Sequence, residues 1–287
     1  MNQTVLDTGA APLRASKREH RFAERYGPWA VVTGASTGIG EAIARGLAHR
    51  GINVVLVARS ATTLQHLAED LSRTHHVKTL VLPLDVGLRE STDRLVAATN
   101  NLDIGLLVAA AGFGTSGPFL SNSLGTELDM IEVNCAAVCA QAHHFAQRFA
   151  HRGRGGLILL ASIVGFQGMP YAANYAATKA YIQALGEGIS VELKAAGVDV
   201  LTAAPGPTAS AFAKRAGMRM SGADSPQQIV KPILNALGKR TTVLPSVRSK
   251  FLRATVLTMP RRNGRVWIMG NIMKAMTEHN DLKKATP

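Results

Sequence analysis

The chain reads Thr33-Gly34-Ala35-Ser36-Thr37-Gly38-Ile39-Gly40 directly after a short apolar segment, and a helical pattern follows at once. Glycine lets the backbone turn tightly, and the free N–H groups at the start of a helix attract phosphate. Three glycines alone are a weak signal, but between a strand and a helix they predict a dinucleotide-binding loop. The residues that we expect to contact the dinucleotide in this loop are Gly34, Ser36, Thr37, Gly38, Ile39 and Gly40.

Around this loop, the sequence alternates short apolar segments with longer helical patterns. The segments are apolar on both faces, as in parallel strands that helices cover on each side. We therefore predict one α/β domain over residues 28–246, a Rossmann-type, doubly wound parallel sheet with helices on both faces. The expected strands are residues 30–33, 54–58, 79–83, 106–110, 157–161 and 198–204, and the expected helices are residues 40–49, 61–74, 88–99, 125–151 and 174–196.

Less regular segments flank the alternating part. Residues 1–27 are interpreted as an N-terminal extension with a short helix near residues 18–25, and residues 247–287 as a basic, helical C-terminal extension. Residues 205–222 combine turn formers with small residues, which favours a mobile segment over a site. Asp224-Ser225-Pro226 is typical of a helix start, so we expect a helix at residues 225–237 and a last strand at 241–245. Residues 248–258 and 266–277 have amphipathic patterns.

Composition narrows the class of protein. Hydrophobic residues make up 46% and charged residues 18% of the chain, which argues against disorder. The longest apolar stretches, such as residues 157–166, are shorter than the roughly 18 residues that span a bilayer. The first 25 residues lack the apolar core of a signal peptide, and two cysteines cannot form a disulfide framework. The expected location is the cytoplasm, with attachment at the periphery of a membrane surface as an open alternative.

The net charge of +13 is unevenly distributed. Residues 28–210 hold 12 Lys/Arg and 13 Asp/Glu, whereas residues 211–287 hold 15 and three. This asymmetry favours an anionic partner, either an acidic acyl-carrier protein or an anionic membrane surface, and a plain solvated surface is the alternative. Aromatic residues are few in the basic quarter and no helix-turn-helix or zinc pattern occurs, so nucleic acid is not expected.

The ends of the second and third predicted strands suggest which dinucleotide binds. An acid after the second strand would hold the 2′-hydroxyl of NAD, but the chain has Ala58-Arg59-Ser60. Arg59 is able to hold a 2′-phosphate, so the sequence predicts NADP(H), although a surface arginine is the alternative. Asp85-Val86 follows the third strand, where the carboxylate would accept the adenine amino group or cap a helix that begins at Leu88.

A helical segment places the candidate chemistry. It begins with Tyr175-Ala176-Ala177-Thr178-Lys179, and a spacing of four puts the phenol and the ammonium on one face. The positive charge should lower the pKa of Tyr175 from about 10. With an oxidised nicotinamide also close, a shift of about three units would allow proton transfer near neutral pH. Ser162 follows the fifth strand, thirteen residues before Tyr175, where its hydroxyl would bind a substrate oxygen or merely cap a turn.

Asn134 lies within the predicted helix at residues 125–151, although asparagine is a poor helix former. A buried amide there would bend the helix and order a water near Lys179. A solvent-facing asparagine is the alternative. On the same helix, Cys135 and Cys139 with the neighbouring histidines allow a metal site, but the surrounding Ala and Val favour buried thiols, and no metal is predicted.

Taken together, these elements resemble the short-chain dehydrogenase/reductase family over residues 29–208. The resemblance implies that Tyr175 is the general acid and base, that Lys179 also holds the nicotinamide ribose, that Ser162 orients the carbonyl and that Asn134 supports a proton-relay water. The motifs that carry it are the loop at residues 33–40, Asp85, Asn134, Ser162, Tyr175, Lys179 and Pro205-Gly206-Pro207-Thr208.

The same resemblance implies that Pro205, Gly206 and Thr208 contact the nicotinamide amide. The extensions at both ends are similar to the hydroxysteroid and long-chain ketoacyl reductase branch of the family. Members of the family commonly pair through the two long helices, which implies a homo-oligomer formed by residues 125–151 and 174–196.

One departure from the family pattern lies after the fourth strand. The family usually has Asn-Ala-Gly there, whereas this chain has Ala109-Ala110-Ala111-Gly112. Ala110 lacks the hydrogen bonds of an asparagine, so we expect a loss of about 1–2 kcal/mol if a backbone group is left unpaired. Ala111 and Gly112 are still expected to contact the cofactor.

The residues around the motifs indicate the substrate. Phe113, Phe166, Met169 and Tyr171 are apolar neighbours that favour a hydrophobic ketone or alcohol. The sequence therefore predicts an NADPH-dependent oxidoreductase that interconverts such a ketone and its secondary alcohol by hydride transfer. A 3-ketoacyl reductase acting on carrier-bound chains and a catalytically silent NADP(H) sensor or scaffold are the alternatives.

Overall fold

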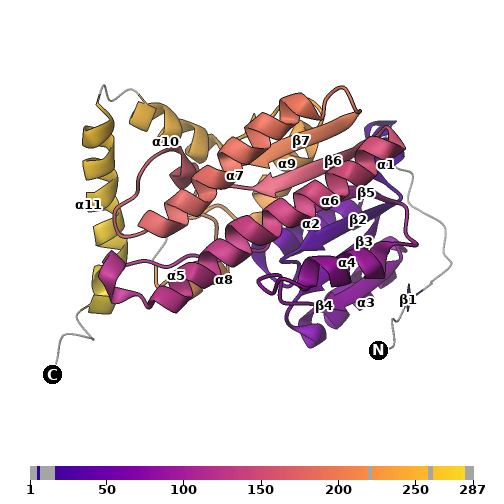
Figure 1. The fold of residues 1–287 in the computed structure, drawn as a ribbon, viewed down its shortest axis with the longest axis horizontal. Coiled ribbons are helices and arrows are strands. Elements are labelled where there is room, and N and C mark those ends of the chain that lie inside the picture. Colours follow the sequence, from indigo (N-terminus) through magenta and orange to yellow (C-terminus); the bar gives the residue numbers. More distant parts are fainter. Residues whose placement is uncertain (1–4, 7–16, 219–221, 258–260, 282–287) are drawn as a thin grey trace.

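A computed structural model describes residues 5–6, 17–218, 222–257 and 261–281 of the chain (Figure 1). Its centre is an eight-stranded sheet with the strand order β1-β4-β3-β2-β5-β6-β7-β8. Strands β2 to β8 run parallel, which confirms the predicted doubly wound sheet, and β1 pairs antiparallel with β4 at the edge. The strands are β1 (Val5–Leu6), β2 (Trp29–Thr33), β3 (Asn53–Ala58), β4 (Thr79–Pro83), β5 (Ile104–Ala109), β6 (Gly155–Leu160), β7 (Val198–Ala203) and β8 (Thr242–Val243).

Alternate residues of each strand enter one of two apolar cores, because successive side chains of a strand point to opposite faces. In β2, Ala30 and Val32 pack against the core on one face, and Val31 packs against the core on the other. Helices α2 (Gly38–Ala48), α3 (Ala61–His75) and α9 (Pro226–Ala236) cover the first face. Helices α4 (Ser91–Thr99), α6 (Ala137–Arg152) and α7 (Ala173–Glu192) cover the second face.

Helix α9 begins where the sequence predicts it. The Ser225 hydroxyl accepts a hydrogen bond from the Gln228 backbone N–H at 3.4 Å, and the Gln228 side chain accepts one from the Ser225 N–H at 3.0 Å. This reciprocal pair satisfies two N–H groups that a helix start would otherwise leave without partners. The helix then packs Ile229 and Ile233 onto the sheet.

Part of the N-terminal extension is bound to the amino edge of the sheet. Helix α1 (Lys17–Tyr26) buries Phe22 and Tyr26, and the Tyr26 hydroxyl donates to the Asp199 carboxylate at 2.7 Å. Arg25 forms an ion pair with the same carboxylate. The pairing of β1 with β4 was not predicted from the sequence, since a strand of two residues carries no periodicity.

Two predicted helices differ in detail. The predicted helix at residues 125–151 is divided into α5 (Leu124–Ile131), a π-helical turn (Glu132–Ala136) and α6. The helix predicted from residue 88 begins instead at Ser91, because residues before it form a turn in which the Asp85 carboxylate accepts from the Gly87 N–H at 3.1 Å. Asp85 is therefore not the cap of α4, whose first flanking residue is Glu90.

The C-terminal quarter folds over the end of the sheet to which the strands point. The short helix α8 (Ala211–Arg215) is followed, after α9 and β8, by α10 (Val247–Leu257) and α11 (Arg262–Asp281), which lie together at the left of Figure 1. Met269 and Met273 of α11 are buried in a third apolar cluster with Phe113, Met169 and Tyr175. Among the helices that the structure describes, none has the length and apolar character needed to span a bilayer.

Candidate active site

The glycine loop is shaped by close backbone approaches. Gly34 has φ +68°, and a Cβ there would lie 2.8 Å from the backbone of Ala111 in the loop after β5. A Cβ on Gly40 would lie 2.2 Å from the Gly34 carbonyl oxygen. Only glycine fits both positions, so the loop can turn directly into α2. The Thr37 side chain makes no capping hydrogen bond, which leaves the first N–H groups of α2 facing outward for a phosphate.

A cavity of about 780 Å³ runs from this loop to the C-terminal helices. It lies at the carboxyl ends of the parallel strands, where ligands of such sheets bind. The side chains and backbone needed for a dinucleotide therefore share one cleft. Its wall includes every residue predicted for the cofactor, namely Gly34, Ser36, Thr37, Gly38, Ile39, Gly40, Arg59, Asp85, Val86, Ala111, Gly112, Tyr175, Lys179, Pro205, Gly206 and Thr208.

One rim of the cavity carries a cation and a carboxylate. Nη1 of Arg59 lies 3.9 Å from Oδ2 of Asp85, and the two side chains are 63% and 43% exposed. An exposed pair at this distance contributes little to stability, so Arg59 is free to turn toward a phosphate. The hydroxyl of Ser60 already accepts from the Thr63 N–H at the start of α3.

The Ala110 departure leaves neither neighbouring backbone amide unpaired. The Ala111 N–H donates to the Thr33 hydroxyl at 3.3 Å, and the Ala110 N–H donates to the Val108 carbonyl at 3.2 Å. The expected loss of a hydrogen bond is therefore wrong for these two amides. The hydroxyl of Thr33, buried beside them, supplies the partner that a short alanine side chain lacks.

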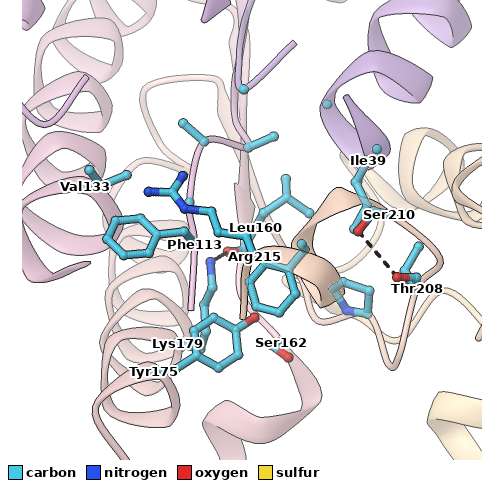
Figure 2. Close-up of a pocket in the computed structure, with 18 of the residues that line it drawn as sticks. Ile39, Phe113, Val133, Leu160, Ser162, Tyr175, Lys179, Thr208, Ser210 and Arg215 are labelled. Atoms are coloured by element: carbon cyan, nitrogen blue, oxygen red, sulfur yellow. Dashed lines mark hydrogen bonds between the residues drawn. The ribbon is translucent and has the colours of Figure 1, made fainter. Parts of the chain in front are cut away.

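The chemical groups converge on the floor of the cavity (Figure 2). Ser162 follows β6, and its hydroxyl lies beside the Tyr175 hydroxyl, whose pKa it lowers. Lys179 lies one turn further along α7, with its Nζ 5.8 Å from the centroid of the Tyr175 ring. The ammonium donates to the Leu160 carbonyl oxygen at 2.8 Å, so the last residue of β6 holds it in place. All three side chains are less than a tenth exposed.

Burial dominates the acidity of these groups. It raises the pKa of Tyr175 to about 12, and the neighbouring Ser162 hydroxyl opposes this shift only in part. Burial likewise lowers the pKa of Lys179 to about 8. The expectation that Lys179 lowers the pKa of Tyr175 is therefore wrong for this structure, because desolvation of the phenolate outweighs a cation beside the ring. At neutral pH, Tyr175 is a neutral phenol and thus a proton donor.

Asn134 acts behind the cavity wall rather than in it. Its side chain is fully buried, which excludes the solvent-facing alternative. Its Oδ1 accepts from the Phe113 N–H at 3.1 Å, and its Nδ2 donates to the Phe113 carbonyl at 2.8 Å and the Thr178 hydroxyl at 3.0 Å. These bonds tie the loop after β5 to α7, and the π-helical turn lets the amide reach both. Its support of a proton-relay water stays a prediction.

A second buried network holds the start of α7. The Glu127 carboxylate accepts from the Thr115 hydroxyl at 2.8 Å and from the Asn174 amide at 2.7 Å. Asn174 directly precedes Tyr175, so this carboxylate fixes the helix end that carries the phenol. Sequence reasoning missed Glu127, because a single acid in an amphipathic helix gives no signal of burial.

The segment after β7 lies against the glycine loop. The Ile163 N–H donates to the Pro205 carbonyl at 3.0 Å, and the Thr208 hydroxyl donates to the Gly206 carbonyl at 3.1 Å. A Cβ on Gly38 would lie 2.9 Å from the Ser210 Cβ, which brings the start of α8 onto the phosphate end of the site. Within the part of this segment that the structure describes, residues 205–218 thus line the cavity, and the predicted mobility stays a prediction.

The predicted substrate residues are placed unequally. Phe113 and Met169 are buried and line the cavity. Phe166 and Tyr171 do not line it, which corrects the prediction for these two. The ring of Phe166 lies under the Arg253 guanidinium at 4.3 Å, and Tyr171 packs against the third apolar cluster from its outer side. Proximity in sequence to Ser162 and Tyr175 did not reveal which way these rings point.

The remaining apolar wall comes from the last third of the chain. The spacing of Met269, Met273 and Met276 on one face of α11 was the available signal, since residues 266–277 have an amphipathic pattern. Arg215 of α8 stacks over the Phe113 ring at 4.0 Å beside this wall (Figure 2). The wall residues from the C-terminal part are Phe212, Met218, Leu252, Met269, Ile272, Met273 and Met276.

The cysteines on the π-helical turn and α6 are half-buried thiols rather than fully buried ones. Cys135 donates weakly to the Thr178 carbonyl at 3.8 Å, and burial raises the pKa of its thiol to about 11. Within the described ranges, no group of three or more His, Cys, Asp or Glu side chains is arranged to hold a metal ion.

Comparison with known proteins agrees with this geometry. Residues 28–220 match the short chain dehydrogenase family, and the chain therefore belongs to that family. It is an oxidoreductase that acts on hydroxyl or carbonyl substrates with a nicotinamide dinucleotide.

Two curated relatives act on steroid or acyl substrates by name. A 7beta-hydroxysteroid dehydrogenase of Clostridium sardiniense is 33% identical over 227 residues, which cover 78% of this chain and 87% of that protein. A very-long-chain 3-oxoacyl-CoA reductase of Meyerozyma guilliermondii is 34% identical over 233 residues, covering 77% of this chain and 67% of that protein.

Two solved structures share the fold. A 7beta-hydroxysteroid dehydrogenase superposes with a TM-score of 0.80 at 27% identity, covering 86% of this chain and 98% of that chain. A short-chain dehydrogenase from Sphingobium yanoikuyae in complex with NADPH superposes with a TM-score of 0.73 at 28% identity, covering 82% of this chain and 97% of that chain.

Proposed function

We propose that the protein is an NADPH-dependent reductase that converts a hydrophobic ketone into its secondary alcohol. The observation that carries the proposal is the meeting of Ser162, Tyr175 and Lys179 on the floor of a cavity whose far wall is apolar. The reverse oxidation follows the same path, and the neutral phenol of Tyr175 favours the direction in which it gives up its proton.

The choice of NADPH rests on the rim of the cavity. Ala58-Arg59-Ser60 offers a guanidinium and a hydroxyl and no acid where the adenosine ribose is held in this fold. Arg59 pairs only loosely with Asp85, so it is available for a 2′-phosphate. A related dehydrogenase that binds NADPH supports the same choice. The glycine cradle between Gly34, Gly40 and Ala111 leaves the backbone close enough to hold the pyrophosphate.

The reaction needs one hydride and one proton. When bound, NADPH supplies the hydride to the carbonyl carbon. The hydroxyls of Ser162 and Tyr175 bind the carbonyl oxygen, and Tyr175 donates its proton to that oxygen as the alcohol forms. Lys179, held by the Leu160 carbonyl, supplies positive charge near the phenolate that remains, and with Asn134 it restores the proton from solvent.

The substrate class follows from the wall. Phe113, Met169 and the methionines of α11 form an apolar wall with the Arg215 guanidinium at its side, which suits a bulky apolar ketone. The flexible thioethers fit irregular shapes better than a rigid aliphatic wall would. The relatives named as a hydroxysteroid dehydrogenase and a very-long-chain 3-oxoacyl-CoA reductase support a steroid-like or acyl substrate.

The test is turnover of purified protein. NADPH oxidation should be measured with a panel of small, steroid-like and long-chain ketones, and each should be repeated with NADH. We expect turnover with at least one bulky ketone and a clear preference for NADPH over NADH. Equal rates with NADH, or activity confined to small polar carbonyls, would contradict the proposal.

A 3-ketoacyl reductase acting on carrier-bound chains is the second candidate. The acyl-CoA relative and the fifteen Lys/Arg among residues 211–287 favour it. A KM for the carrier-bound substrate that rises steeply with salt would support an acidic carrier as partner. A silent NADP(H) sensor is disfavoured by the intact Ser162, Tyr175 and Lys179.

Assembly of two or more copies through α5, α6 and α7 stays a prediction. Exposed apolar side chains on these helices support it, and light scattering of the purified protein would test it. Those side chains are Leu124, Leu128, Ile131, Tyr181 and Val191.

A further inference from the structure

The charge of the C-terminal quarter is concentrated in an acid-free stretch. Residues 225–277 contain ten Lys/Arg and no Asp or Glu. Seven of the ten lie within residues 247–277, which form α10, α11 and their connection. The catalytic groups use none of these charges. Lys250, Arg261 and Arg262 are exposed members of this set, and exposed charges of one sign attract an anionic partner through several ångströms of solvent.

The two helices have distinct inner and outer faces. The inner faces bury Met269 and Met273 and bring Leu252 into the cavity wall. On α10, Val247 and Phe251 are 81% and 70% exposed and flank exposed Lys250 at helical spacing. The outer face therefore combines an aromatic ring, an aliphatic side chain and a cation.

Helix α11 also exposes an aromatic ring and cations, but two of these cations lie at its N-terminal end rather than on the face that carries the ring. Trp267 is 69% exposed on the side opposite Met269, and exposed Arg261 and Arg262 lie at the start of the helix. The two helices follow each other at one end of the molecule, beyond the carboxyl ends of the strands (Figure 1). Their exposed apolar and basic residues thus belong to one end of the protein, which also closes the cavity.

This chemistry discriminates between anionic partners. An acidic protein would also pack on exposed apolar side chains, but exposed Val247 and Phe251 beside cations, next to a cavity with an apolar wall, favour a lipid surface. A bilayer with anionic headgroups takes both: basic side chains pair with the phosphates, and Trp and Phe enter the boundary with the acyl chains. We infer that the outer faces of α10 and α11 dock the protein on an anionic lipid surface, next to the apolar cavity.

The inference extends the proposed function, because a lipid-derived ketone dissolved in the bilayer would reach the cavity from the surface on which α10 and α11 rest. The docking itself requires no turnover. Binding and reduction are therefore measured separately, and failure of one does not imply failure of the other.

The experiment is sedimentation of the purified full chain with vesicles. One set is made of phosphatidylcholine alone and the other of phosphatidylcholine and phosphatidylglycerol in equal parts. We expect binding to the anionic vesicles that weakens as salt is added, and little binding to the neutral ones. Equal binding to both sets, or to neither, would overturn the inference.

Variants locate the surface. Arg261→Gln with Arg262→Gln should reduce partition into anionic vesicles on the order of 30-fold, because each cation near such a surface contributes about 1 kcal/mol. Val247→Ser with Trp267→Ser should also reduce partition into anionic vesicles, but the salt dependence of that partition should stay unchanged. Lys239→Gln with Arg240→Gln is the matched control. Both residues are exposed and directly precede β8. They lie at the amino edge of the sheet, beside Gly238, where α1 packs.

The controls keep the outcomes separate. Each variant should reduce a water-soluble ketone at the wild-type rate and unfold at the wild-type temperature, because its substituted side chains lie outside the cavity. A loss of binding in the Lys239/Arg240 pair equal to that in the Arg261/Arg262 pair would show a diffuse charge effect and overturn the docking surface. Capture of an acidic carrier protein without any binding to anionic vesicles would overturn it in favour of a protein partner.

Discussion

The side chains of Ser162 and Tyr175 lie beside each other on the floor of the cavity (Figure 2), and both are less than a tenth exposed. A serine hydroxyl in this position has access to the same substrate oxygen as the phenol. It also moderates the rise in the pKa of Tyr175 that burial causes. Ser162 thus acts on the substrate and on the acid at the same time.

Replacing Ser162 by alanine should lower kcat for ketone reduction by about 10²-fold, as the removal of one donor to a developing oxyanion does. NADPH should bind as before, because Ser162 lies at the chemical end of the cavity. Stopped-flow turnover and NADPH fluorescence titration measure the two effects. A variant that keeps more than half of its turnover would assign Ser162 to the turn it caps at Val164.

Lys179 gives the protein a pH-dependent stability. Its pKa is about 8 when folded against a usual 10.5, so the unfolded chain binds more protons between these values and folding stability rises with pH there. From about pH 7 to about pH 9, the wild type should gain about 1 kcal/mol relative to Lys179→Met. Denaturant unfolding at both pH values measures the difference. Lys179 lowers the pKa of the Cys135 thiol, so both proteins are compared in a Cys135→Ser background. A Lys179→Met variant with the pH dependence of its parent would contradict the assignment.

Arg59→Ala should raise the Kd of NADPH roughly 10- to 100-fold, since it removes a charge-assisted contact. The Kd of NADH should change little, because NADH carries no 2′-phosphate. Isothermal titration with both dinucleotides measures the ratio. Arg73→Ala is the matched control, an arginine on α3 whose side chain is 81% exposed. An equal loss of affinity for NADPH and NADH would show that Arg59 does not contact the 2′-phosphate.

Glu127→Ala should destabilise the protein by about 1–3 kcal/mol, because it leaves the Thr115 hydroxyl without its acceptor and the Asn174 amide with only the main-chain carbonyl of residue 127. Glu127→Gln should cost less, since its carbonyl can still accept from Asn174 while the Thr115 hydroxyl turns to accept from its amino group. Chemical denaturation of both variants gives the comparison. If Glu127→Ala and Glu127→Gln lowered the free energy of unfolding equally, the amide of the Glu127→Gln variant would not replace the hydrogen bonds of the carboxylate, and this account of Glu127 would be wrong.

Met273→Phe tests the wall that α11 contributes. A larger, stiffer side chain at a buried wall position should raise KM for a bulky ketone roughly tenfold. KM for a small ketone should stay within a factor of about two, because it does not reach α11. Asn271→Phe, on the exposed side of the same helix, is the control. Equal changes for both ketones would remove α11 from the substrate site.

Local patterns predicted the sheet and the chemical motif. The loop at residues 33–40 and the spacing of Tyr175 and Lys179 are fixed by neighbours in sequence, so a strand-to-helix turn and a helical face could be inferred from them. The position of Ser162 followed from the rule that functional groups gather at the carboxyl ends of parallel strands. These inferences needed no knowledge of how distant segments pack.

What the sequence did not predict depends on tertiary burial. The pKa of Tyr175 rises because Phe212 and the rest of the covering segment exclude water from the phenol, and this cannot be deduced from Lys179 at helical spacing. The outward position of Phe166 and the inward position of Met273 likewise depend on how α10 and α11 return to the site. The Thr33 hydroxyl accepts a hydrogen bond from the Ala111 N–H, a partner that the Ala110 side chain cannot provide. Thr33 and Ala111 are 78 residues apart in the chain.

The most direct test is Tyr175→Phe, which removes one oxygen atom and keeps the ring. We predict that the variant binds NADPH with the wild-type Kd, unfolds at a similar temperature and loses at least about 10³-fold in turnover of a ketone that the wild type reduces. If it retained a tenth or more of wild-type turnover, the phenol would not be the proton donor and the mechanism proposed for this cavity would be wrong.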